Sequence, residues 1–403
     1  MLYDSFVSAI NPACAAAAHV SRFVPPAPQF VDASRYVIAA DPRDYWRALQ
    51  TGGVFVDPGG YYLVTRREDV AAALRDYATF ASARKPLTPS GRKSLPIPVP
   101  IAYDPPEHSR FRRILQPYFS SRAADELVPV LREQASALIN AVAPNGGCEA
   151  ISDIADPFPF GVLMSLCGLP SDDRDKLAAL ADVNWDMTGS QPGSELFTYL
   201  AAAITSDERP ALAARLLTDD DPLTEEEVIG FYALLCLAQD GIQAAIGSAL
   251  LRLARNPQLC SLLRDDPDQF GAFVEELVRL ETPLPFIGRF TTKTVTIAGV
   301  TIPAGSVVRL CLASANLDET EKPSVTVADG KIRARPHWGF GGGVHRCLGA
   351  ALARMELTVI VAEWLRVVPD FELEPDFAPR FTFTQGGAIK PGSLPLRWGQ
   401  TRP

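Results

Sequence analysis

The sequence has no uninterrupted apolar stretch long enough to cross a membrane. No run of about 18 or more apolar residues occurs among the 403 residues. Residues 10–20 come closest to a signal peptide, but Asn11, Pro12 and His19 interrupt them and no basic cluster precedes them. We therefore expect a soluble, cytoplasmic protein without a membrane anchor.

Basic residues and cysteines are also few. The 38 Lys and Arg residues are outnumbered by 47 Asp and Glu residues, and the net charge is −9. Nucleic-acid binding needs a clustered basic surface, so we do not expect it here. The seven cysteines are odd in number, scattered and mostly set in apolar runs, which favours reduced thiols over a disulfide framework. Six are expected to be core residues, and the seventh, Cys347, has different neighbours.

Hydrophobic periodicity predicts a mainly α protein with small β-sheets near both ends. No internal repeat or low-complexity linker divides the chain, so we expect one domain over residues 1–403. Its β-containing part and an access loop would occupy residues 1–100, and a helical body residues 101–403. The predicted segments are a strand at 61–65, a helix at 69–74, a Pro-rich loop at 85–100, mostly helix over 104–264, a hairpin of 295–297 and 300–302, and strands at 381–383 and 394–396.

A glycine-rich loop over residues 340–349 precedes a predicted helix at 348–365. Its three consecutive glycines allow positive φ and close approach of the backbone to a flat ligand. A thiolate at a helix N-terminus is stabilised by free N–H groups and the helix dipole, so the pKa of Cys347 is expected to be lowered. Iron ligation needs such an anionic sulfur. The simpler alternative is a glycine turn with a chance cysteine.

Two further segments place charged residues at helical spacing. Asp104 is expected to be an N-cap, with Glu107 closing a capping box. His108 and Arg112 would then lie one turn apart on one face, where they can bind a carboxylate. Glu276 and Arg279, at i and i+3, form a second pair, which alone would be an ordinary solvated ion pair.

The loop residues Phe340, Gly343, Cys347 and Gly349 match the pattern Phe-x-x-Gly-x-x-x-Cys-x-Gly, and the chain thereby resembles the cytochromes P-450, most closely their soluble actinobacterial members. The resemblance implies the P-450 fold, with haem b between the proximal Cys347 loop and a long distal helix. It implies propionate binding by His108, Arg112, Arg289 and His345, haem contacts at Phe340 and Gly349, and a structural role for Glu276 and Arg279.

The distal helix departs from the family pattern Gly-x-Asp/Glu-Thr, whose acid and alcohol deliver protons during oxygen activation. In the best register Asp240 keeps the acid, Gly241 replaces the threonine and Ala238 replaces the glycine. A register shifted by one would lose both groups. A mid-helix glycine costs about 0.5–1 kcal/mol relative to alanine. It would accommodate a local bulge, or a water or substrate group, unless it reflects neutral drift.

A second departure spans residues 319–337, a shortened segment that leaves the local geometry open. Family positions also imply a mainly apolar substrate pocket, as in most small-molecule sites. Its residues would be Leu237, Gln239, Gly241, Ile242, Leu284, Phe286, Ile287 and Phe383. Gln239, Gln243 and Arg84 could add polar selectivity.

The resemblance implies a monomeric monooxygenase that inserts one atom of O2 into a small, largely apolar organic substrate. Its electrons would come from a separate ferredoxin and ferredoxin reductase, because no flavin or reductase domain is expected in a chain this short. The alternatives are a peroxide-driven or oxidative-coupling haem enzyme and a non-catalytic haem-binding or sensor protein. Retention of Asp240 favours catalysis.

Overall fold

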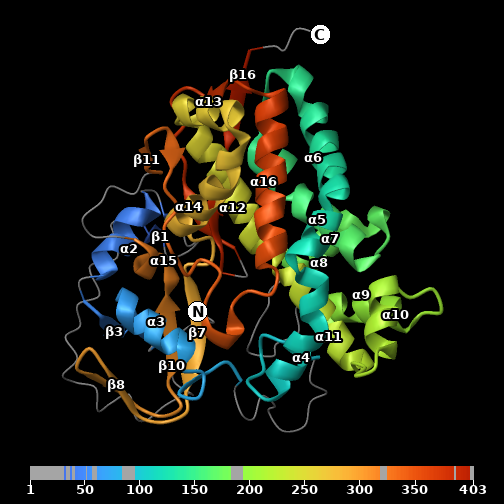
Figure 1. Cartoon of the computed structure of the whole chain (residues 1–403), viewed down its shortest axis with the longest axis vertical. Coiled ribbons are helices and arrows are strands. Elements are labelled where there is room, and N and C mark those ends of the chain that lie inside the picture. The colour runs from blue at the N-terminus through green and yellow to red at the C-terminus, as the bar shows by residue number, and fades with distance from the viewer. Residues whose placement is uncertain are drawn as a thin grey trace.

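The structure is a computed structural model. It describes residues 31–32, 37–38, 41–50, 52–56, 61–83, 96–182, 194–317, 325–384 and 387–399. The apolar stretch 10–20, Cys14, Arg84 and most of the predicted loop 85–100 lie outside the described residues. Helices make up most of the described fold and the strands form small sheets (Figure 1), as the sequence predicts.

Where the structure describes residues 104–264, the predicted helical character is confirmed, and it is interrupted by elements that periodicity did not show. These are strand β6 (Gly147–Glu149) and a π-helix at Ile151–Ala155, which packs closely on the distal helix at Gly247. The helices are α2 (Pro42–Gln50), α3 (Arg67–Arg75), α4 (Glu107–Leu115), α5 (Ser121–Glu126), α6 (Val128–Val142), α7 (Pro157–Cys167), α8 (Arg174–Asp182), α9 (Ser194–Thr205), α10 (Ala211–Thr218), α11 (Glu225–Leu237), α12 (Gln239–Ala254), α13 (Pro257–Asp265), α14 (Phe270–Glu281), α15 (Leu312–Asn316) and α16 (Ala350–Val367).

The largest described sheet positions one predicted haem-binding residue, Arg289. Its strand order is β3 (Val54–Val56), β4 (Tyr62–Val64), β10 (Val307–Cys311), β7 (Phe286–Thr291) and β5 (Phe80–Ala81). Arg289 on β7 pairs with Val308 on the antiparallel β10. β7 is hydrogen-bonded to β10 on one side and to β5 on the other, so the position of the Arg289 backbone is fixed by the sheet.

The remaining strands confirm most of the predicted β-segments. The hairpin of β8 (Val295–Ile297) and β9 (Val300–Ile302) and strand β14 (Phe381–Phe383) have the predicted bounds. β14 lies in a sheet ordered β1 (Val31–Asp32), β2 (Val37–Ile38), β14, β15 (Ile389–Pro391). A third sheet has the order β13 (Phe371–Leu373), β16 (Pro395–Trp398), β6, and a short hairpin joins β11 (Val327–Ala328) to β12 (Lys331–Ile332).

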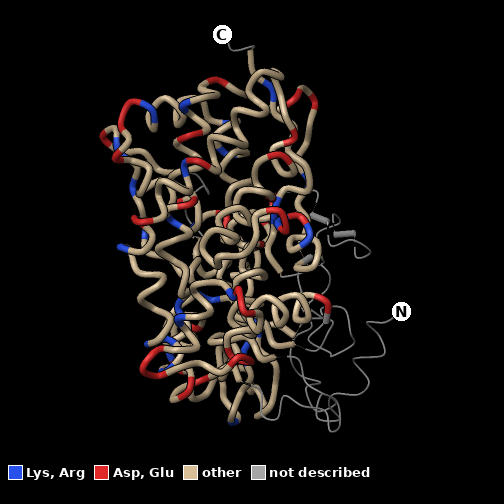
Figure 2. Tube along the Cα trace, turned by 90° about the vertical axis from the view of Figure 1, so that its right-hand side faces the viewer, with Lys and Arg blue, Asp and Glu red and all other residues tan. Residues whose placement is uncertain are grey.

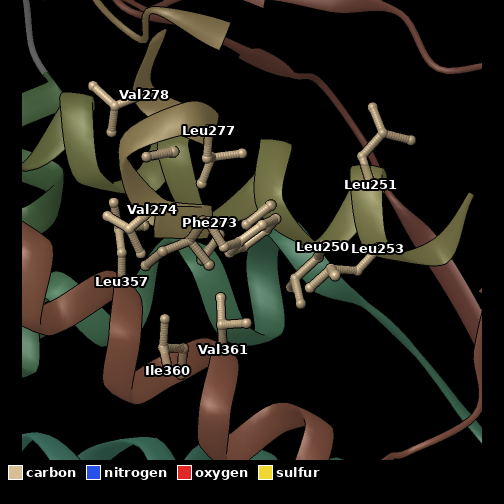
Figure 3. Close-up of a cluster of buried hydrophobic side chains, with 14 of the residues drawn as sticks. Leu250, Leu251, Leu253, Phe273, Val274, Leu277, Val278, Leu357, Ile360 and Val361 are labelled. Atoms are coloured by element: carbon tan, nitrogen blue, oxygen red, sulfur yellow. The ribbon is translucent and has the colours of Figure 1, made fainter. Parts of the chain in front are cut away.

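A hydrophobic core joins α12, α14 and the helix that follows Cys347, α16 (Figures 1 and 3). All of its central side chains are at most 2% exposed: Leu250, Leu253, Phe273, Val274, Leu277, Val278, Leu357, Ile360 and Val361. Since close-packed interiors resist displacement, this packing fixes α16, and with it the end of the Cys347 loop, relative to the distal helix.

Helices α11 and α12 together are long and apolar enough to cross a membrane by length and composition, with a hydropathy of 1.4 over Glu225–Ala254. The expectation from the sequence was that no such segment exists. However, 67% of the most apolar 18-residue stretch of this helix pair is buried inside the protein. A helix that is apolar on most sides and buried is typical of the core of a large fold, so this helix pair is weak evidence for a span.

Charged residues of both signs are interspersed along the described chain (Figure 2). Many form local pairs, such as Arg122 with Glu126 and Arg397 with Glu372. Exposed pairs of this kind contribute little to stability. Recognition of charged ligands must therefore depend on local clusters rather than on a field of one sign over the whole surface.

Glu356 on α16 is only 6% exposed, and burial raises the pKa of its carboxyl to about 8 from an ordinary value of 4.5. The folded protein then keeps a proton that the unfolded chain releases above pH 4.5, so its stability falls as the pH rises towards 8. We predict that Glu356→Gln raises the free energy of unfolding by about 1–2 kcal/mol at pH 8 and changes it little at pH 5. Denaturant titrations at both pH values measure this. An identical pH dependence for the two proteins would contradict it.

Candidate functional site

The loop that carries Cys347 is folded back on itself and packed against α3. The backbone N–H of Cys347 donates to the carbonyl of Phe340 at 2.8 Å. Gly341 and Gly343 have φ of 66° and 65°, and a Cβ at Gly343 would lie 2.0 Å from the carbonyl oxygen of Leu74. At Gly343 the structure thus requires glycine for contact with α3, a reason the sequence did not reveal.

Two residues of α14 and α16 support the start of this loop. The Arg354 guanidinium lies 4.3 Å from the ring centroid of Phe340 and pairs with Glu275, whose other partner is His337 at 3.1 Å. Burial raises the pKa of Glu275, but hydrogen bonds from His337 and Arg354 outweigh it and lower this pKa to about 2. Sequence reasoning missed Glu275, because a single acid beside Glu276 has no distinctive spacing.

The predicted pair Glu276–Arg279 is buried rather than solvated, at 0% and 2% exposure. Arg279 donates twice to Glu276, at 2.8 Å each, and once to the Asn316 carbonyl. The backbone N–H of Arg335 donates to Glu276 at 2.8 Å, and that of Trp338 to the Asn316 side chain at 2.7 Å. The pair thereby binds α14 and α15 to the segment that leads into the Cys347 loop.

This network also fixes part of the geometry of the shortened segment 319–337, which the sequence left open. Residues 318–324 lie outside the described part of the chain. From residue 325 onwards the shortened segment forms the β11–β12 hairpin and then returns to Glu276 through Arg335.

The four predicted propionate-binding residues come together where α4, β7 and the Cys347 loop meet. The rings of His108 and His345 have centroids 4.2 Å apart, and Arg112 donates to the Arg346 carbonyl at 2.8 Å. Arg289 is 8% exposed and donates to its neighbouring Gly288 carbonyl at 2.7 Å. Burial lowers the pKa of Arg289 to about 10, and Asp104 opposes this only in part.

The electrostatics of this cationic cluster (His108, Arg112, Arg289, His345) fit an anionic ligand. Burial, reinforced by His345 and Arg112, lowers the pKa of His108 to about 4, so this ring is neutral near pH 7. Among the described residues no carboxylate forms an ion pair with Arg112 or Arg289. A ligand with two carboxylates, as haem has, would supply the missing negative charge.

Asp104 is not the N-cap that the sequence predicts. α4 begins at Glu107, and its N-cap Pro106 has no side-chain hydrogen bond. The Asp104 carboxylate instead accepts from the backbone N–H groups of Ser82 and Ala83, at 3.2 and 2.8 Å, and contacts the Nε2 atom of His345 at 3.0 Å. These partners from distant segments replace the local cap, and Asp104 orients His345.

The pKa of Cys347 is raised, whereas the sequence predicted that it would be lowered. Cys347 keeps exposed surface, yet the surrounding protein removes enough water from its sulfur to raise the pKa. The Gly349 N–H, Arg112 and Arg354 oppose this effect without outweighing it. α16 begins only at Ala350, three residues after Cys347, and the effect of a helix dipole falls off beyond the first turn. A coordinated metal ion would deprotonate the thiol outright.

The distal helix is interrupted at Ala238, between α11 and α12. Ala238 is exposed, while Cys236 and Ile242 on either side are 2% and 7% exposed. A Cβ at Gly241 would lie 3.7 Å from Leu284 Cδ1, an ordinary contact, with nothing else within 4 Å. Sterics therefore do not require glycine at 241, and the interruption lies three residues earlier.

The other predicted pocket residues are spread over several packing environments. Phe286 packs edge-on against Trp46, with ring centroids 5.3 Å apart. Ile287 packs against a hydrophobic cluster that includes Val308 and Leu310 of β10. Leu237 and Phe383 are half-buried on α11 and β14. Gln243 donates to the Asp156 carbonyl at 3.1 Å, so it holds α12 to the start of α7. A pocket role for these residues stays a prediction.

The sequence is similar to known proteins over the region that contains the site residues described above. The cytochrome P450 family matches residues 232–393, which include most of the distal helix, Glu276, Arg279 and Cys347. The chain is 33% identical over 349 residues to the probable cytochrome P450 127A1 of Sinorhizobium fredii, covering 83% of this chain and 82% of that protein. It is 32% identical over 331 residues to the vitamin D(3) 25-hydroxylase of Pseudonocardia autotrophica, covering 78% and 82%.

Among solved structures, P450BioI in complex with a fatty-acid-ligated acyl carrier protein matches with a TM-score of 0.77 and 27% identity, over 90% of this chain and 99% of that one. Fold and relatives together define the class as a haem-thiolate monooxygenase. The chain belongs to the cytochrome P450 family, among its bacterial members. Family membership implies haem, O2, a redox partner and a small substrate.

We predict that Arg112→Ala weakens haem retention, because a charge-assisted bond to a partly buried carboxylate contributes about 1.5–3 kcal/mol. Arg113→Ala is the matched control, since Arg113 follows on the same helix but has a side chain 72% exposed and paired with Asp221. Haem occupancy and thermal midpoint of the purified proteins measure the effect. Normal occupancy in Arg112→Ala would argue against propionate binding there.

Proposed function

We propose that Cys347 is the proximal thiolate ligand of haem b in an enzyme that inserts one oxygen atom into a small, largely apolar organic substrate. The observation that carries the proposal is the exposed Cys347 close to Arg112 and Arg289, neither of which forms an ion pair with a carboxylate among the described residues. When bound, haem supplies the oxygen-activating chemistry. The side chains of this protein bind it, orient it and control protons and water.

In this proposal the charged and the neutral members of the cationic cluster have different roles. Arg112 and Arg289 supply positive charge to the two propionates. His108, neutral because of its low pKa, donates a hydrogen bond without adding charge to an already crowded cluster. Asp104 holds His345 in orientation, in the same way that carboxylates orient metal-bound histidines in other proteins.

On the distal side, Asp240 would hold and release protons through ordered water, because no alcohol is present at Gly241. A hydroxyl on the native substrate could complete the same route. The apolar residues Leu237, Ile242 and Leu284 would exclude bulk water, and Leu284 is the side chain nearest to Gly241. An apolar site suits an apolar substrate.

We further propose that electrons come from a ferredoxin and its reductase, and that the protein works as a cytoplasmic monomer. Two exposed arginines lie at the Cys347 loop: Arg346 is part of it, and the Cα atom of Arg75 lies 3.3 Å from a Cβ built at Gly343. An acidic partner such as a ferredoxin would be steered to this face by charge complementarity.

A second candidate function is peroxide-driven oxidation or oxidative coupling, and the observation that favours it is the absence of an alcohol at Gly241. Turnover with NADH, ferredoxin reductase and ferredoxin, compared with turnover by peroxide alone, separates the two candidates. A non-catalytic haem-binding protein would turn over under neither condition.

We predict that the reduced protein with carbon monoxide shows the red-shifted Soret band that gives the family its name. Cys347→Ala should abolish this band, because the band depends on a thiolate ligand. Cys311→Ala serves as the control, since Cys311 is fully buried in β10. If Cys347→Ala keeps the band, the proximal assignment is wrong.

We predict that Gly241→Thr raises the yield of product per NADH on generic apolar substrates, because it restores an alcohol where the structure has space for a β-carbon. Proton transfer by a positioned side chain typically contributes about 10²–10⁴-fold to a rate. On a native substrate with a polar group, binding should instead weaken, because the new side chain occupies the ligand's space. Peroxide release is measured in parallel. Unchanged coupling on generic substrates would mean that the missing alcohol is not limiting.

A further inference from the structure

Helix α4 carries charged side chains on two of its faces. His108 and Arg112 belong to the cationic cluster at the Cys347 loop. Arg110 and Arg113, which lie at i and i+3, instead contact the loop that joins α10 to α11. Successive residues of an α-helix are rotated by about 100°, so the two pairs point in different directions. One short helix thus connects the proposed haem-binding residues to the start of the distal helix.

Asp221 lies between these two arginines and uses both of its carboxylate oxygens. Its Oδ1 atom accepts from Arg110 at 2.8 Å, and its Oδ2 atom accepts from Arg113 at 2.7 Å. Arg110 also donates to the backbone carbonyl of Pro222 at 2.7 Å. The hydrogen bonds from the two arginines lower the pKa of the Asp221 carboxyl, so it stays ionised throughout the neutral range. Both a side chain and the backbone of this loop are therefore bound to α4.

The bound loop leads directly into α11, the first part of the distal helix. Thr224 caps this helix: its hydroxyl accepts from the Glu227 N–H at 3.2 Å, and the Glu227 carboxylate accepts from the Thr224 N–H at 2.8 Å. Arg110 donates to the same carboxylate at 3.4 Å. One arginine of α4 therefore holds both the loop before α11 and an acidic residue in the first turn of α11.

Apolar packing alone does not specify how the two helices are oriented. Phe111 and Leu115 of α4, and Val228 and Phe231 of α11, belong to one cluster of buried side chains. Burial of apolar surface brings the helices together but is not directional. Hydrogen-bonded ion pairs, in contrast, have a defined geometry. The charged contacts therefore add an orientation that the burial of apolar surface does not supply.

We propose that Arg110, Arg113, Asp221 and Glu227 form an ionic clamp through which α4 positions the start of the distal helix. The proposal rests on the proposed function, in which a carboxylate ligand of the cationic cluster holds α4 from its other face. Ligand binding then restricts the first turns of α11 through the clamp. Arg110 and Asp221 are positioning residues in this role, because they act on the distal side only through the helices that they join.

The clamp is exposed enough to respond to salt. The side chains of Arg110 and Asp221 are 32% and 42% exposed, and that of Arg113 is 72% exposed. Ion pairs of this kind are individually weak, and added salt screens them. Loss of the clamp should therefore loosen the start of α11 without unfolding the protein or releasing haem.

The same loop supplies a matched control. Asp220 precedes Asp221, is exposed and, among the described residues, is not paired with either arginine. Asp220→Asn removes the same charge from the same loop and leaves the clamp intact. Asp221→Glu is the rescue variant, because it keeps a carboxylate that can bind both arginines.

The experiment measures backbone hydrogen exchange in the haem-loaded proteins over residues 227–231 of α11 and, as a measure of overall stability, over α16. At low salt, Asp221→Asn should speed exchange over 227–231 about two- to fivefold, the range expected for an exposed ion pair. Added salt should speed this exchange in the wild type and change it little in Asp221→Asn. Asp221→Glu and Asp220→Asn should resemble the wild type.

A double-mutant cycle tests whether the clamp transmits binding in the cationic cluster. Arg112→Lys keeps the positive charge but loses the fork of donors that binds a carboxylate. In the haem-loaded protein this substitution should speed exchange over 227–231. The effect should largely disappear when Asp221→Asn is already present, because the connection through the clamp is then broken.

Three results would overturn the proposal. Equal exchange in Asp221→Asn and Asp220→Asn would mean that the clamp does not hold α11. Faster exchange over α16 as well would mean that Asp221 contributes to overall stability and not to the position of one helix. Additive effects of Arg112→Lys and Asp221→Asn would mean that α4 does not transmit ligand binding. Because exchange is measured without turnover, a failure of the proposed monooxygenase function would appear separately, as absence of the carbon monoxide band in the wild type.

Discussion

The buried ion pair between Glu276 and Arg279 is the interaction on which the placement of Cys347 depends. Each charge is removed from water, so neither is tolerable without the other, and breaking such a pair by removing one partner costs about 3–5 kcal/mol. The pair also binds two backbone groups: Arg279 donates to the Asn316 carbonyl, and Glu276 accepts from the Arg335 N–H. Segments distant in sequence are thereby fixed before the chain enters the Cys347 loop.

Two sets of contacts connect this ion pair and its neighbours on α14 to the Cys347 loop and restrict the loop's position. Through the backbone, Trp338 is held by Asn316 and is followed directly by the glycine-rich turn. Through side chains, Glu275 binds Arg354, which in turn lies over the Phe340 ring. Glu275 and Glu276 are adjacent on α14, so one turn of this helix orients the start of the loop by both routes. A buried ion pair adds little net stability, because the loss of hydration of both charges offsets much of their attraction.

The parts of the site that could be predicted from the sequence are those that depend on local spacing. The β8–β9 hairpin, the loop around Cys347 and the Glu276–Arg279 pair follow from turns and from i, i+3 geometry. Asp104 could not be assigned correctly, because its partners Ser82, Ala83 and His345 are remote in sequence. The raised pKa of Cys347 was missed for the same reason, since desolvation is a property of tertiary packing.

In the proposed function, the cationic cluster connects folding to cofactor binding. Arg289 is held by a central strand in a place where burial destabilises its charged form, and Asp104, already shared with His345, compensates only in part. The polypeptide alone therefore bears an electrostatic cost that a dicarboxylate ligand removes. Any ligand that binds the folded state and not the unfolded chain stabilises the fold by mass action. If Arg289 binds a carboxylate of the ligand as proposed, the electrostatic cost of its burial is what couples the stability of the fold to that ligand.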